Sequence, residues 1–281
     1  MIKFKEFFQW FFHRKASDVK MTIKITAAHV KQLISIESGV KYNEPPPLGE
    51  RPFIAIGRES RVMLSAPHGT RTFRDNDMES WHEEDEYTAG MALLLSELCG
   101  TSVIANIWRS DKYDPNYHKK CEYKEHMKEL IVRNQIRFVL DLHGAAQNCR
   151  RMDADQTIDL GYRSEIDAER SIDEIHLAKL ESLFAGVDDS CDPACFVISR
   201  NRFPARGSEA SEPITSFVHR LAIKERVQVV QIEMKPQIRI ANRLPTASLH
   251  KTCADYAADQ RCIIHTLQAL VDYIEYLQNF Y

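Results

Sequence analysis

Short apolar runs alternate along the chain with longer segments in which apolar residues recur at helical spacing. The runs at 61–66, 102–108 and 137–144 are rich in Val, Ile and Leu, which is typical of buried strands. Segments 87–100 and 121–135 lie between these runs and have the spacing of helices. This alternation predicts parallel strands covered by helices on both faces of a sheet.

The later part of the chain continues the pattern. We predict helices at 171–186, 213–225 and 254–278, and a strand at 226–235. The predicted fold class is therefore α/β, with three layers, α/β/α, around a mostly parallel mixed sheet.

A proline-rich segment marks the expected domain boundary. Pro45, Pro46 and Pro47 fix the backbone and remove three hydrogen-bond donors, so this stretch continues neither a helix nor a central strand. We predict an N-terminal extension and linker over 1–52 and a single α/β domain over 53–281. The aromatic residues within 4–12 predict a helix packed on the domain or a loosely ordered extension, with a membrane-surface helix as the alternative.

Charge and cysteine content narrow the range of partners and compartments. The 37 basic and 40 acidic residues give a net charge of -3, which indicates neither a nucleic-acid surface nor an anionic-membrane surface. We find no apolar run long enough to span a membrane. The seven cysteines are an odd number and are scattered, which favours reduced thiols and a cytoplasmic location. A small-molecule substrate is therefore the expected partner.

Polar residues at the ends of predicted strands point to a site. His68 follows the strand at 61–66, His143 lies at the end of the strand at 137–144, and Glu233 lies near the end of the strand at 226–235. In open α/β sheets, ligands bind beyond the carboxyl ends of the strands. We therefore expect these three side chains to converge.

The residue types indicate a zinc centre. Two imidazoles and one carboxylate hold Zn²⁺ with a fourth position open for water, and a separate Glu serves as the base. The acids within 83–86 can supply the carboxylate. Most of these acids are also explained as the charged start of a helix, where Asp and Glu complement the helix dipole.

With these motifs in place, the chain resembles the N-formylglutamate amidohydrolase-like family, which is related in fold to the zinc carboxypeptidases. The resemblance covers roughly residues 60–240. It rests on APHGTRTFR around His68, DEYTAG from Asp85, YDPNYH from Tyr113, YK at Tyr123, FVLDLHGA around His143, IDLG from Ile158 and VQIEMKPQIR ending at Arg239.

The resemblance implies that His68, His143 and Asp85 are zinc ligands, with Glu86 as a rival to Asp85. It also implies that Glu233 deprotonates water, as the late Glu does in the related carboxypeptidase site. The chain departs from the better-known branch of the family, because PHGT replaces the usual histidine, serine and glycine after the proline. DPNYH likewise replaces an arginine-containing motif, so the resemblance does not carry the formylglutamate substrate over to this chain.

Further polar residues are candidates for handling the substrate. We expect Arg109 to stabilise the oxyanion, and Arg150 or Arg151 to clamp a substrate carboxylate. Asn116 and Arg239 complete the expected substrate-binding set.

The sequence thus predicts a zinc-dependent amidohydrolase acting on an N-acyl amino acid, N-formyl included, or a related small amide. The alternatives are a peptidase or peptidoglycan amidase of the same fold, and a metal-binding protein without activity. The presence of Glu233 favours an enzyme, because a non-catalytic relative should lack the base.

Overall fold

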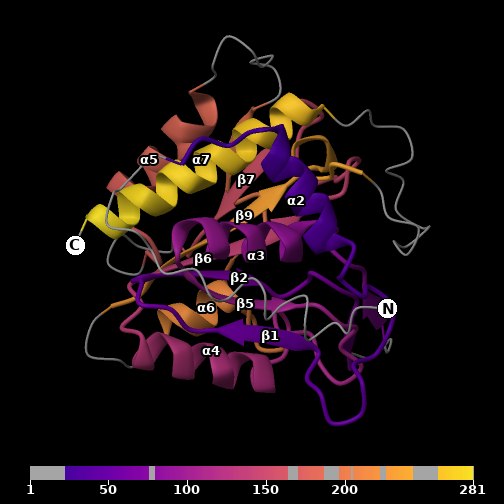
Figure 1. The fold of residues 1–281 in the computed structure, drawn as a ribbon. Coiled ribbons are helices and arrows are strands. Elements are labelled where there is room, and N and C mark those ends of the chain that lie inside the picture. The colour runs from indigo at the N-terminus through magenta and orange to yellow at the C-terminus, as the bar shows by residue number, and fades with distance from the viewer. Residues whose placement is uncertain are drawn as a thin grey trace.

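The computed structural model describes residues 23–75, 80–163, 170–186, 196–203, 205–221, 226–242 and 259–280. In these residues a seven-stranded sheet lies between two layers of helices, which confirms the predicted α/β class. Helices α2 (Ala27–Glu37), α3 (Thr88–Cys99), α5 (Glu174–Ala185) and α7 (Gln260–Asn279) cover one face, and α4 (Glu122–Arg133) and α6 (Ile214–His219) cover the other (Figure 1).

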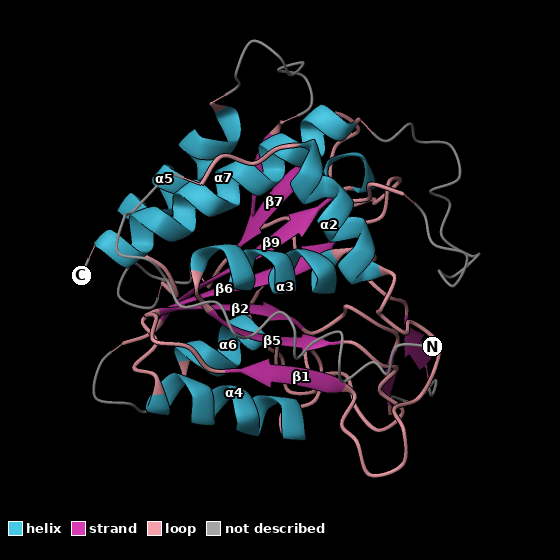
Figure 2. Ribbon diagram, viewed as in Figure 1, coloured by secondary structure: helices cyan, strands magenta, loops and turns pink. Residues whose placement is uncertain are grey.

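The sheet is mixed, with a parallel centre. Its strands are β1 (Phe53–Ile56), β2 (Val62–Ala66), β5 (Ser102–Asn106), β6 (Phe138–Gly144), β7 (Ile158–Gly161), β8 (Ile198–Arg200) and β9 (Gln228–Met234). They are ordered β1-β5-β2-β6-β9-β7-β8 (Figure 2). The pairs β5/β2, β2/β6 and β6/β9 are parallel, whereas β1 and β7 run antiparallel to β5 and β9.

The four central strands are the four predicted from apolar runs, because a strand buried on both faces needs an unbroken apolar sequence. The shorter strands β1, β7 and β8 were not predicted, since three or four residues carry too little pattern. A separate two-stranded ribbon of β3 (Thr72–Arg74) and β4 (Ser80–His82) was also missed. None of the helices in the described part of the chain is long and apolar enough to cross a membrane.

The leading segment is part of the domain, contrary to the predicted boundary at residue 52. Helix α2 buries Val30, Leu33 and Ile36 in the same core as α3 and α7. The proline-rich segment after α2 is a surface loop in which Leu48 is fully exposed. That segment therefore connects two parts of one core. The aromatic stretch within 4–12 lies outside the described residues.

We expect Leu33→Ala to lower the free energy of unfolding by about 2–5 kcal/mol, because the fully buried side chain would leave a cavity between α2 and its neighbours. Leu48→Ala, in the same leading segment, should change stability by less than about 0.5 kcal/mol. Denaturant unfolding of both variants measures the difference. Equal stability for Leu33→Ala and the wild type would show that α2 is not part of the core.

Candidate active site

The two histidines and the glutamate predicted from strand ends lie on three neighbouring strands. His68 follows β2, His143 lies near the end of β6, and Glu233 lies near the end of β9. The register places His143 opposite Glu233 on adjacent parallel strands. All three line one cavity of ≈ 440 Å³. The sheet order therefore brings these side chains together, as the strand-end argument predicted.

Asp85 reaches the same point from the loop before α3. Its backbone N–H donates to the His68 carbonyl at 2.7 Å, which fastens this loop to the end of β2. Its Oδ2 lies 3.5 Å from His68 Nδ1 and 3.2 Å from His143 Nδ1. The described residues contain two groups of side chains that could hold a metal ion, His68 with Asp85 and His143, and His68 with His82 and Asp114. Glu86 belongs to neither group. The structure thus places Asp85, rather than Glu86, between the two imidazoles.

The far nitrogen of each imidazole meets a second carboxylate. His68 Nε2 lies 2.8 Å from Asp114 Oδ1, and His143 Nε2 lies 3.0 Å from Asp141 Oδ2. Asp141 and His143 are alternate residues of β6, and alternate residues share a face of the sheet only where the strand continues. Strand β6 does continue through Gly144, so Asp141 and His143 share a face.

The carboxylates make the cluster attractive to positive charge. Burial acts to lower the pKa of His68 and His143, but Asp114 and Asp85 around His68, and Asp141 and Asp85 around His143, outweigh it and raise both pKa values. Burial acts in the opposite sense on Asp114, yet the charge of His68 is the main influence holding the pKa of Asp114 below its usual range. A proton or a metal ion in this cluster is therefore stabilised by nearby negative charge.

Glu233 borders the cluster from β9. Burial raises the pKa of Glu233 to about 7, with His143 opposing the shift and Asp85 adding to it. Gln231, two residues earlier and on the same face of β9, donates from Nε2 to Glu233 Oε1 at 2.6 Å. This carboxylate is held in a fixed orientation and can exchange a proton near neutral pH.

The ribbon of β3 and β4 contributes side chains that sequence reasoning missed. Arg74 and His82 both line the cavity. Arg74 Nε lies 2.5 Å from Asp114 Oδ2, and its guanidinium lies over the Tyr117 ring. His82 stacks on His68 with ring centroids 3.9 Å apart. The motif APHGTRTFR contains Arg74, but strands of three residues leave no periodic signal to show which way it points.

Among the expected substrate-binding residues, Asn116 and Arg151 line the cavity. Arg150 and Arg109 are outside its described lining. Arg109 Nε pairs with Asp111 Oδ1 at 2.5 Å on the surface, and its Nη1 donates to the Asn43 carbonyl at 2.8 Å. The oxyanion role expected for Arg109 does not fit this position, because its guanidinium is directed to surface partners.

Arg239, also expected to bind substrate, lies outside the described lining of the cavity and bonds backbone carbonyls. It is only 1% exposed and donates from Nε to the Met234 carbonyl at 3.0 Å and from Nη1 to the Glu86 carbonyl. A Cβ at Gly144 would meet its guanidinium at 2.6 Å, so glycine is needed there for the arginine to fit. These bonds join the end of β9 to the loop that carries Asp85.

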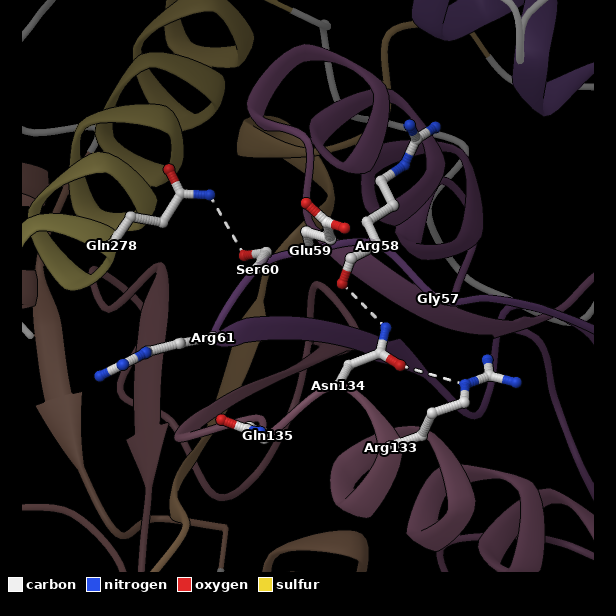
Figure 3. Close-up of a pocket in the computed structure, with 9 residues that line it drawn as sticks. All are labelled: Gly57, Arg58, Glu59, Ser60, Arg61, Arg133, Asn134, Gln135 and Gln278. Atoms are coloured by element: carbon white, nitrogen blue, oxygen red, sulfur yellow. Dashed lines mark hydrogen bonds between the residues drawn. The ribbon is translucent and has the colours of Figure 1, made fainter.

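A larger hollow lies elsewhere, where α4 ends and β2 begins, and it has a different character. It is lined by Gly57, Arg58, Glu59, Ser60, Arg61, Arg133, Asn134, Gln135 and Gln278. Figure 3 shows the Arg61 side chain extending to the opposite side from the side chains of Arg58 and Arg133. No group of metal-ligand side chains gathers there among the described residues. We therefore take the cavity around His68 as the candidate active site.

Comparison with known proteins finds solved structures that resemble this chain at low sequence identity. No family model matches the chain, and no curated protein matches it. N-formylglutamate amidohydrolase from Ralstonia eutropha JMP134 is similar in structure, with 14% identity, a TM-score of 0.48, and coverage of 80% of this chain and 97% of that one. A bacteriophage poly-gamma-glutamate hydrolase has 14% identity, a TM-score of 0.42, and coverage of 82% and 92%. A metallo-carboxypeptidase from Burkholderia cenocepacia has 9% identity, a TM-score of 0.42, and coverage of 90% and 70%.

We expect Arg239→Ala to lower the free energy of unfolding by about 3 kcal/mol or more, because buried carbonyls would lose a charged donor. Arg151→Ala is the matched control, since this exposed arginine should affect stability by less than about 0.5 kcal/mol. Thermal and denaturant unfolding measure both changes. Wild-type stability in Arg239→Ala would return Arg239 to the substrate-binding role predicted from sequence.

Proposed function

We propose that this protein is a metal-dependent hydrolase of amide bonds, with Zn²⁺ held by His68, Asp85 and His143. The observation that carries the proposal is the paired arrangement of the imidazoles. Each presents Nδ1 to Asp85 and Nε2 to a buried carboxylate. A carboxylate behind a ligating histidine fixes its tautomer and raises its basicity, which is the usual support for a metal-bound imidazole.

The donor set fits zinc. One ligand atom from each of the three residues lies within 4.8 Å of the others, and all three side chains are buried. Two nitrogens and one oxygen match the preference of Zn²⁺, and three protein ligands leave one position open for catalysis. When bound, Zn²⁺ supplies Lewis acidity, which polarises a carbonyl oxygen and acidifies water.

The other residues around the cavity have complementary roles. Glu233 accepts the proton of the attacking water and returns it to the leaving nitrogen as the carbon–nitrogen bond breaks. Arg74 replaces Arg109 as the group that stabilises the developing oxyanion, since it lines the cavity and keeps its orientation through Asp114. Arg151 also lines the cavity, and its role in the proposal is to bind a substrate carboxylate.

These residues favour an N-acyl amino acid as substrate, N-formyl amino acids included. The cavity volume of ≈ 440 Å³ is in the range of small-molecule sites. Two lining arginines suit a substrate that carries a carboxylate.

The cysteines support the proposal of a reducing, cytoplasmic location. Their total of seven is odd, and the described residues include four free thiols, Cys99, Cys121, Cys149 and Cys262.

Metal analysis tests the ligand set. We expect purified wild-type protein to carry one zinc ion per chain, and we expect His143→Ala and Asp85→Asn to lose most of it, because each removes one of three ligands. Glu86→Gln is the matched control and should retain zinc. Elemental analysis after dialysis gives the stoichiometry. Zinc retained in Asp85→Asn but lost in Glu86→Gln would move the ligand role to Glu86.

A substrate screen tests the reaction. We expect turnover within a panel of N-acyl amino acids, and we expect Glu233→Gln to lower it by ~10²–10⁴ while keeping zinc, because the variant loses only the base. Glu209→Gln, an exposed carboxylate, should match the wild type. Turnover of peptides or peptidoglycan fragments alone would favour the second candidate, a peptidase or peptidoglycan amidase. Zinc binding with no hydrolysis of any amide would indicate a non-catalytic metal protein.

A further inference from the structure

A buried carboxylate outside the catalytic cluster faces the start of α3. Glu37, the last residue of α2, is fully buried. Its Oε1 accepts the backbone N–H of Tyr87 at 2.6 Å and the hydroxyl of Tyr42, and its Oε2 accepts the backbone N–H of Gly90 at 2.8 Å. One side chain therefore satisfies backbone donors in the first turn of α3, where the helix dipole favours negative charge.

The backbone that Glu37 holds is the one that carries Asp85. Tyr87 lies two residues after Asp85 and has a φ of 70°. This is a left-handed backbone conformation that few residues other than glycine adopt. The Thr88 hydroxyl donates to the Asp85 carbonyl at 2.8 Å, which closes the turn. A strained turn of this kind persists only where surrounding contacts impose it. The bond from Tyr87 N–H to Glu37 is one such contact.

Hydrogen bonds from three other segments also hold the Asp85–Tyr87 turn. Asp85 N–H bonds the His68 carbonyl, and Arg239 bonds the Glu86 carbonyl. The Tyr87 hydroxyl donates to the carbonyl of Asn242, which follows β9 in the sequence. Of these, Glu37 is the partner that comes from the leading helix, outside the region where the sequence motifs lie. Burying a carboxylate there is costly unless its hydrogen bonds repay it.

Gly90 shows how closely Glu37 approaches the helix. A Cβ at Gly90 would collide with Glu37 Oε2 and would also touch Glu37 Cβ at 3.3 Å. Glycine lowers helix stability, so its presence within α3 is explained by the room it leaves for the carboxylate.

We propose that Glu37 is a positioning residue for the metal site, fixing the Asp85–Tyr87 turn so that the Asp85 carboxylate stays between His68 and His143. This inference rests on the proposed function, because it needs Asp85 to be a metal ligand. It makes helix α2 part of the catalytic apparatus through the backbone of a single turn. The carboxylate itself does not touch the cavity.

The test is the zinc affinity of Glu37→Gln in the full chain, measured by competition with a chromogenic chelator. The amide side chain keeps the size of Glu37 but replaces one acceptor oxygen with a donor, so it cannot accept both backbone N–H groups. Burial raises the pKa of Glu37 to about 7, so measurement at pH 8.5 compares the ionised carboxylate with the amide. We expect zinc affinity to fall 10- to 100-fold, the range found when a residue supporting a ligand is removed. We also expect the visible spectrum of the Co²⁺-loaded protein to change, because Asp85 would no longer be held.

Val30→Ala is the matched control, since it removes a buried side chain from the same helix two turns before Glu37. It should lower stability and leave the zinc affinity and the Co²⁺ spectrum of the folded protein unchanged. Wild-type affinity and spectrum in Glu37→Gln would overturn the positioning role alone. A wild type that binds no zinc would overturn the proposed function and this role together. If Glu37→Gln does not fold, Gly90→Ala displaces the same carboxylate, and it should weaken zinc binding in the same direction; unchanged binding there also overturns the role.

Discussion

The electrostatic balance of one buried cluster constrains the rest of this molecule. Asp85, Asp114, Asp141 and Glu233 are buried around two imidazoles, and charges removed from water must be compensated within the protein. The raised pKa of each histidine shows that the cluster favours added positive charge. The proposed divalent cation would satisfy that demand more fully than protons do, because it would bind both imidazoles and a carboxylate at once. The same surplus of negative charge explains why Arg74 pairs with Asp114 at the cavity wall.

The sheet provides the rigidity that such a cluster needs. Strands β2, β6 and β9 are adjacent and parallel, so their carboxyl ends meet at one edge. His143 and Glu233 are fixed opposite each other by backbone hydrogen bonds and not by loop conformation. The Asp85 loop is less regular, and several bonds from distant segments hold it. Groups on strands are positioned more accurately than groups on loops, and the extra fastening of the Asp85 turn compensates for this difference.

The hydrogen bonds that hold the Asp85–Tyr87 turn also explain two differences between the structure and the predictions from sequence. The sequence predicted that Arg239 binds substrate, yet its guanidinium donates to the backbone carbonyls of Met234 and Glu86. The sequence predicted that residues 1–52 form an extension and linker. Helix α2 lies within this range, yet it is buried in the main core, and its last residue bonds the start of α3. In both cases a buried charged side chain bonds the backbone next to Asp85. The contribution of these residues to the site is therefore indirect.

The sequence by itself determined the central strands, because burial on both faces requires unbroken apolar runs, and it determined His68, His143 and Glu233 as residues at one sheet edge. It also limited the proposed third metal ligand to one short acidic block. The tertiary structure decided that Asp85 faces the imidazoles, because the Asp85 N–H bonds the His68 carbonyl and holds this residue of the block at the end of β2. It also placed Arg74, rather than Arg109, at the cavity. Both arginines lie beside the ribbon of β3 and β4, which is hydrogen-bonded to the segment at Ser110, and only this tertiary pairing determines where their guanidinium groups lie.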